Sequence, residues 1–76
     1  MDLEVIILTP EKIVFEGKAN SIILPGEHGV FEVLPYHKPL ISRLISGKVM
    51  LDTHSVTIRR GIVSVNNNRV TIVIEQ

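Results

Sequence analysis

Short blocks of aliphatic residues run along the whole chain, separated by turn-forming residues at intervals of about ten positions. In the last block, Val70, Ile72 and Ile74 occupy every second position, with Thr71, Val73 and Glu75 between them. Residues two apart in a β-strand lie on the same face, so this period indicates strands with one buried face. The pattern predicts an all-β fold of short antiparallel strands, in a sandwich or a barrel.

Two β-hairpins are expected in the C-terminal half. Asp52 to Ser55 forms a turn between the alternating residues around Val49 and those around Val56. Asn66-Asn67-Asn68 separates the next two apolar runs, and asparagine tolerates the left-handed dihedral angles that tight hairpin turns require.

The N-terminal half predicts three further strands. Leu3 to Leu8 is apolar on nearly both faces until Pro10, as expected for a buried central strand. "KIVFEG" and "SIIL" are the next two. The segment "PLISRLISG" has leucine and isoleucine at near-helical spacing, but it follows Pro39 and stops at Gly47 within too few residues for a stable helix. We expect it to be extended or bulged.

Composition narrows the class of protein. Seventy-six residues without a linker, repeat or charge run indicate one domain, residues 1–76, which buries only roughly 60% of its unfolded surface. Without cysteine there is neither a disulfide framework nor a cysteine zinc site. Eight basic residues balance eight acidic ones and only three aromatics are present, so nucleic acid is not an expected partner. No signal peptide or membrane-spanning run is evident, which predicts a soluble intracellular protein.

The stretch "LPGEHGVFEVLPYHKPL", Leu24 to Leu40, differs from the plain strands around it. Its three prolines fix backbone dihedrals, while Gly26 and Gly29 permit turns that other residues resist. Rigidity of this kind reduces the entropy lost on binding, so the stretch is interpreted as a preorganised contact surface. His37, bracketed by prolines, is expected to be a hydrogen-bonding anchor or a contact residue rather than a proton donor.

Catalytic and metal sites are poorly supported. None of the serines lies in the glycine-flanked elbow of a serine hydrolase, and "PGEHG" leads into a strand rather than a phosphate-binding helix. A metal site that uses His28 with Glu27 or Glu32 is conceivable, although these side chains are better explained as solvated loop residues. Two other classes stay open: a small-ligand-binding or enzymatic sandwich, and a self-assembling β-module.

Beyond these patterns, the chain resembles the N-terminal β-sandwich of the epsilon subunit of rotary ATP synthases. The most specific part is the ordered series Leu-Pro-Gly, Gly-x-Phe and Leu-Pro-x-His-x-Pro-Leu. The resemblance covers nearly the whole chain, through "TP" at Thr9-Pro10, "VFEG" at Val14 to Gly17, "LPGEHGVFEVLPYHKPLIS" at Leu24 to Ser42, Gly61, and "NNRVTIVIE" at Asn67 to Glu75.

The resemblance implies two stacked antiparallel sheets of about ten short strands, without cofactor, metal or catalytic residues. It implies a central-stalk subunit that locks the ring of c subunits to the gamma subunit, coupling rotation driven by protons or sodium ions to ATP synthesis. The isolated chain would be a monomer, held at the cytoplasmic face of the membrane through the complex without entering the bilayer. By similarity, the gamma contacts are His37 and Ser42, and the c-ring contacts are Gly26, Glu27, His28, Gly29, Val30 and Phe31.

The chain also departs from the family pattern. Val30 stands where an acidic residue is frequent, Glu32 and Tyr36 stand where glycine is frequent, and Arg60-Gly61 replaces a glycine pair. Family members usually continue into two C-terminal helices that can bind ATP or inhibit hydrolysis, whereas this sequence stops after its last predicted strand. The helical pair is therefore expected to be absent, and its regulatory roles are not carried over.

Overall fold

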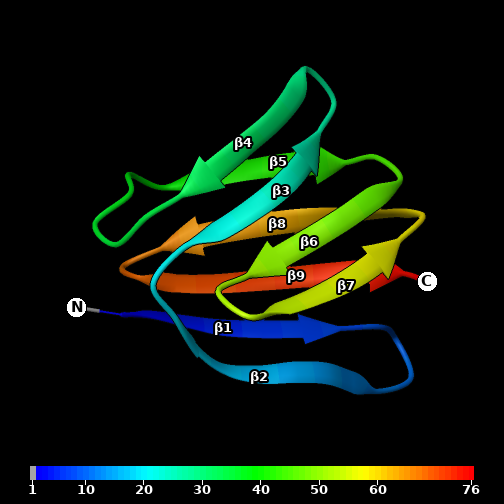
Figure 1. Cartoon of the computed structure of the whole chain (residues 1–76), viewed down its shortest axis with the longest axis horizontal. Helices are drawn as coiled ribbons and strands as arrows, with labels where there is room; N and C mark the ends of the chain where they lie inside the picture. The colour runs from blue at the N-terminus through cyan, green and yellow to red at the C-terminus, as the bar shows by residue number, and fades with distance from the viewer. Residues whose placement is uncertain (1) are drawn as a thin grey trace.

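Nine β-strands make up the computed structural model of the protein, which describes residues 2–76 (Figure 1). Nothing within these residues is helical, and so none of them forms a helix that could cross a membrane. The strands are β1 (Leu3–Leu8), β2 (Ile13–Ala19), β3 (Ile22–Gly26), β4 (Gly29–Val33), β5 (Leu40–Leu44), β6 (Gly47–Leu51), β7 (His54–Ile58), β8 (Arg60–Asn66) and β9 (Arg69–Glu75).

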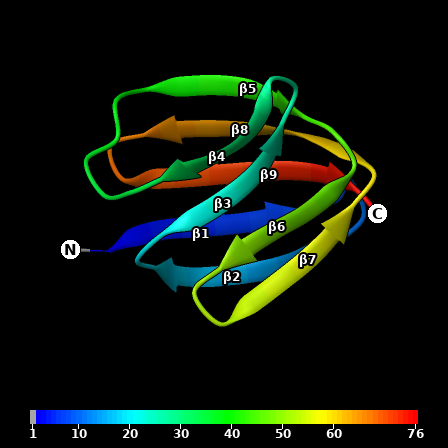
Figure 2. The same ribbon diagram turned by 45° about the horizontal axis from the view of Figure 1, so that its top comes forward.

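Hydrogen bonds join all nine strands into one sheet that folds over on itself. The strand order is β2-β1-β9-β8-β5-β3-β6-β7, with β4 paired to the free side of β3. The sheet bends between β5 and β3, because these two strands are paired only at Gly26–Leu44. One layer therefore contains β2, β1, β9, β8 and β5, and the other contains β4, β3, β6 and β7 (Figures 1 and 2). Across the open side, the rings of Phe15 and His54 lie 5.3 Å apart.

The all-β class and the sandwich architecture are confirmed, and the structure adds two details. Residues 2–76 contain nine strands where about ten were expected, and the two layers are continuous through β3 and β5. Most pairs are antiparallel, but β1 and β9 run parallel from Glu4–Arg69 to Leu8–Val73. This pairing joins the two ends of the chain and places β1 between β2 and β9, the central position predicted for Leu3–Leu8.

Every strand contributes at least one aliphatic side chain to a single core. The alternation predicted for β9 is present, since Val70, Ile72 and Ile74 are buried while Thr71 and Val73 face outward. The core residues are Leu3, Val5, Ile7, Ala19, Ile22, Leu24, Val33, Leu44, Val49, Leu51, Ile58, Val63, Val65, Val70, Ile72 and Ile74.

Residues 40–44 form β5, as the short length of that segment indicated. Leu40 and Leu44 point toward the core, while Ile41 lies on the opposite face and is largely exposed. Apolar residues on both faces of one strand therefore produced the near-helical spacing in the sequence.

Both predicted C-terminal hairpins are present, but the first turn is shorter than the expected Asp52 to Ser55, because His54 and Ser55 already pair within β7. Asn67 and Asn68 have φ angles of 51° and 61° and form a two-residue turn, as expected for type I′. In the other hairpin, the Asp52 carboxylate accepts hydrogen bonds from the backbone N–H groups of Asn20, at 3.1 and 3.2 Å, and of Ser21, at 3.4 Å. These bonds attach the β6–β7 turn to the connection between the two layers.

Truncating the core should unfold much of the protein. Ile72→Ala removes a fully buried side chain from β9, which lies between β1 and β8, and such changes cost about 2 to 5 kcal/mol. That loss approaches the total stability expected for so short a chain, roughly 4 to 11 kcal/mol. The matched control is Thr71→Ala on the exposed face of the same strand, which should change the free energy of unfolding by less than about 0.5 kcal/mol. Urea denaturation measures both, and equal losses would contradict the assignment of the core.

Candidate contact surfaces

The β3–β4 connection is a two-residue turn made by Glu27 and His28. Strands β3 and β4 pair as far as Gly26–Gly29, so the turn projects from the end of a continuous ladder. Gly29 has a φ of 123°, which L-residues with a side chain rarely adopt. Gly26 is buried, and a Cβ there would lie 2.8 Å from the Phe31 ring and 2.9 Å from the Gly29 carbonyl oxygen. The two glycines thus shape the turn for different reasons.

Of the six residues predicted to contact the c-ring, four lie exposed at the tip of the β3–β4 hairpin and two lie beneath the tip and support it. Glu27, His28, Gly29 and Val30 are exposed, and 74% of Val30 is accessible. Gly26 is buried, and Phe31 is half-buried against the core. Only the first four offer a broad surface to a partner.

A second turn spans Leu34 to His37. The N–H of His37 donates to the carbonyl oxygen of Leu34 at 3.1 Å, with Pro35 at the second position and Tyr36, at φ 68°, at the third. This is the pattern of a type II β-turn. The N–H of Tyr36 donates to Oδ1 of Asn68 at 2.6 Å, which ties the turn to the β8–β9 hairpin.

His37 is hydrogen-bonded, as expected from its position between prolines. Its Nδ1 lies 2.7 Å from the carbonyl oxygen of Lys38. A carbonyl oxygen only accepts, so this contact requires the proton on Nδ1. The ring is half-buried and held in one orientation.

Ser42, the other predicted gamma contact, lies in β5 and is half-buried. Side chains alternate along a strand, so Ser42 faces the core side with Leu40 and Leu44, while Ile41 and Arg43 face outward. The predicted segment around Ser42 therefore presents Ile41, which is 77% exposed, more openly than the serine itself.

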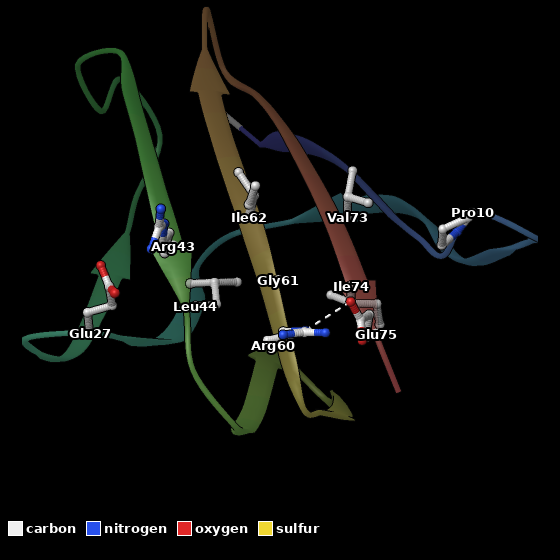
Figure 3. A pocket seen from close by; sticks show the side chains of 10 residues that line it. All are labelled: Pro10, Glu27, Arg43, Leu44, Arg60, Gly61, Ile62, Val73, Ile74 and Glu75. Atoms are coloured by element: carbon white, nitrogen blue, oxygen red, sulfur yellow. Dashed lines mark hydrogen bonds and ion pairs between the residues drawn. The ribbon is translucent and has the colours of Figure 1, made fainter.

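The outer face of β5, β8 and β9 carries an apolar strip that the sequence reasoning did not identify. Cross-strand pairing places Arg43 beside Ile62 and Ile62 beside Val73, and both aliphatic side chains are about half exposed. A shallow hollow of about 390 Å³ adjoins the strip, with Glu27 at its β5 side (Figure 3). At its other side, Nε of Arg60 donates to Oε2 of Glu75 at 2.9 Å. The sequence did contain a signal for this strip, because Val73 is apolar although it occupies an outward position between Ile72 and Ile74.

The two turns lie at opposite ends of β4. The Glu27–His28 turn precedes β4, and the Leu34–His37 turn follows it, beside the Asn67–Asn68 turn (Figure 1). The structure therefore separates His37 from the predicted c-ring residues, whereas Ser42 lies in β5 two residues from Leu44, which pairs with Gly26.

The residues that the structure describes contain no cluster of side chains suited to hold a metal ion. Among residues 2–76, no three histidine or acidic side chains converge on one point. Glu27, His28 and Glu32, the conceivable ligands, are all exposed. His54 instead lies against the ring of Phe15.

Comparison with known proteins identifies the family. Residues 2–76 match the family described as "ATP synthase, Delta/Epsilon chain, beta-sandwich domain". An ATP synthase epsilon chain of Chlorobaculum tepidum is 39% identical over 92% of this chain and 85% of its own length; one of Nitratiruptor is 37% identical over 96% of this chain and 60% of its own length.

Solved structures share the fold at low sequence identity. The central stalk and c-ring structure of Tetrahymena thermophila mitochondrial ATP synthase contains a chain that matches all of this one at 15% identity, with a TM-score of 0.82 over 65% of its own length. A Euglena gracilis mitochondrial ATP synthase structure gives 17% identity and a TM-score of 0.85, over 99% of this chain and 51% of the other. From the family match and the curated relatives, the chain belongs to the β-sandwich family of ATP synthase delta and epsilon chains.

Proposed function

We propose that this chain is a non-catalytic rotor subunit of an ATP synthase, which locks the c-ring to the gamma subunit so that ion-driven rotation is coupled to ATP synthesis. Its relatives are ATP synthase epsilon chains, and chains of its fold occur in structures of ATP synthase central stalks and c-rings. In this role the chain makes and breaks no bonds. It would be held at the cytoplasmic face of the membrane by the complex.

The observation that carries the proposal is the separation of two rigid turns within one sheet. The Glu27–His28 turn closes a paired ladder, and the Leu34–His37 turn is fixed by Pro35, by one backbone hydrogen bond, and by a second bond from the Tyr36 N–H to the Asn68 side chain. Strand β4 joins them directly. A compact body with stiff contacts at two separate places can transmit torque between two partners without bending.

The ring contact is assigned to the first turn. Its tip presents the Glu27 carboxylate, the His28 imidazole and the aliphatic Val30, all exposed. A partner loop with basic side chains complements the carboxylate, and Val30 supplies apolar area beside it. Gly26 and Phe31 support this tip from beneath.

The gamma contact is assigned to the segment from His37 to Ser42. The contact of His37 with Lys38 favours one ring orientation, and Ile41 exposes an aliphatic side chain on the same outer face as Ile62 and Val73. A gamma surface that covers this strip would bury Ile41 rather than contact Ser42 extensively. Removal of apolar surface from water favours a complex by about 25 cal/mol for each Å², before the entropy cost of association is subtracted.

The direct test is binding to the purified gamma subunit of the same organism. Sedimentation and calorimetric titration should give a one-to-one complex, and Ile41→Asp should weaken it by about tenfold or more without lowering the melting temperature. A stable homo-oligomer that ignores gamma would instead favour a self-assembling module, and would refute the proposal.

Gly29→Val should destabilise the ring-facing turn through its backbone. A Cβ at Gly29 would meet no atom within 4 Å, so the cost is the positive φ alone, about 1 to 3 kcal/mol. The melting temperature should fall by about 4 to 8 °C for each kcal/mol lost, and ATP-driven proton pumping in reconstituted vesicles should fall with it. Val30→Ala, next along the chain and exposed, is the control for stability. An unchanged melting temperature would show that the turn adopts another conformation.

Glu27→Lys should separate function from fold. The carboxylate is exposed, so its reversal leaves the melting temperature within about 2 °C of the parent. Docking to a basic ring loop should weaken by about fivefold at low salt and by less at high salt, because salt screens exposed charges. Proton pumping should fall relative to ATP hydrolysis measured in parallel. If both Glu27→Lys and Gly29→Val pump like the parent, this turn is not the ring contact.

A further inference from the structure

Strand β7 (His54–Ile58) ends one side of the sheet, and its outer edge pairs with no other strand among residues 2–76. The other described strands with a free edge are β2, β4 and β5, and each carries a charged side chain: Glu16 and Lys18, Glu32, and Arg43, respectively. Charged residues on an edge strand oppose pairing with another chain. Strand β7 contains no lysine, arginine, aspartate, glutamate or proline. It is therefore the edge best suited to accept a further strand.

The backbone groups of β7 divide between β6 and the free edge. A two-residue turn joins Leu51 to His54, and the residues that flank such a turn form a hydrogen-bonded pair. Because hydrogen-bonded pairs alternate along an antiparallel ladder, His54 and every second residue after it point their N–H and C=O groups at β6. The same groups of Ser55 and Thr57 therefore point at the free edge, and both residues are exposed.

The core is incompletely covered beside this edge. Phe15 on β2 and Val56 on β7 pack against the core but are only half-buried, and these two edge strands lie on the open side of the sandwich (Figure 2). The Phe15 ring contacts His54 across that side. A strand added to β7 would set a side chain beside Val56 and remove apolar surface from water.

Strand β7 is complementary to a second copy of itself in one antiparallel register. A twofold axis through Val56 places Ser55 of each copy opposite Thr57 of the other, and Val56 opposite its counterpart. Ser55 and Thr57 are the residues whose backbone groups face the free edge, so each pair can exchange both of its N–H···O bonds. Hydroxyl residues opposite each other and β-branched residues opposite each other are favourable cross-strand pairs.

The charges that flank β7 favour the same arrangement. Asp52 precedes the strand and Arg59 follows it. Antiparallel pairing brings the Arg59 end of one copy to the Asp52 end of the other, whereas parallel pairing would bring like charges together. Asp52 already accepts bonds from the N–H groups of Asn20 and Ser21, and the Arg59 guanidinium lies 3.6 Å from the Glu75 carboxylate. The flanking charges thus select the orientation without replacing these contacts.

We propose that β7 is a self-association edge, through which two copies of the free chain pair antiparallel about Val56. This inference goes beyond the proposed function and does not depend on it, since none of the residues assigned to the ring or gamma contacts lies in β7. It differs from the monomer that the family resemblance implies for the isolated chain, and sedimentation separates the two states.

Two double variants test the register. Ser55→Glu with Thr57→Glu sets like charges opposite each other in both cross-strand pairs, which should raise the dissociation constant of the dimer by about tenfold. Ser55→Lys with Thr57→Glu sets opposite charges at the same places, and should dimerise within about threefold of the parent chain. Both variants place a carboxylate opposite Lys48 of β6, so their melting temperatures should agree within about 4 °C. Glu32→Lys, on the β4 edge, is the control and should dimerise like the parent.

Sedimentation equilibrium of the full chain between about 10 μM and about 1 mM measures these constants. Amide hydrogen exchange gives a second measurement that needs no variant. In the parent, exchange at Ser55 and Thr57 should slow as concentration rises, because pairing engages their N–H groups, whereas exchange in the buried strand β9 should not change.

Each outcome has a distinct meaning. A parent chain that stays monomeric throughout the concentration range overturns the inference, and the proposed function stands. If the parent dimerises but both double variants weaken equally, or neither does, the register about Val56 is wrong and the inference is overturned. A dimer that Glu32→Lys alone disrupts forms through β4, which also overturns it. A parent chain that dimerises as expected but binds no gamma supports the inference and overturns the proposed function.

Discussion

The shared core is the constraint on which the rest of the molecule depends. All nine strands bury aliphatic side chains in it, and residues 2–76 form no further layer that could replace a missing one. Because β3 joins the other layer only through the Gly26–Leu44 pair, burial of its Ile22 and Leu24 also helps to fix where the β3–β4 ladder ends. The positions of both contact turns are therefore consequences of core packing rather than of local sequence alone.

Inward-facing residues of the sheet provide stability, whereas the turns at the ends of its strands are available for recognition. Inward positions are almost uniformly aliphatic, whereas the ends carry glycine, proline and asparagine that set the turns. This division fits the role proposed for a chain whose relatives are ATP synthase epsilon chains.

Local patterns were sufficient for most of the fold. Alternation in β9 and the Asn67–Asn68 turn are properties of adjacent residues, and both were predictable from the sequence. The parallel pairing of β1 with β9 could not be predicted, because it joins residues near opposite ends of the chain and is not reflected in any local sequence pattern. For the contact surfaces, the sequence indicated one rigid stretch from Leu24 to Leu40, but the Pro35-Tyr36 order is equally compatible with a type I turn and so did not predict the positive φ of Tyr36. The inward direction of Ser42 and the outer strip of Ile41, Ile62 and Val73 required the register of the sheet.

The central claim is that both turns are already rigid before any partner binds. Backbone amide relaxation by NMR on the isolated chain tests it most directly, because order parameters report the stiffness of each N–H separately. The account predicts values of about 0.85 at Glu27, His28, Tyr36 and His37, matching those in β8 and β9. Values below about 0.6 at these positions, beside rigid strands, would show that the turns become ordered only on binding and would contradict the account.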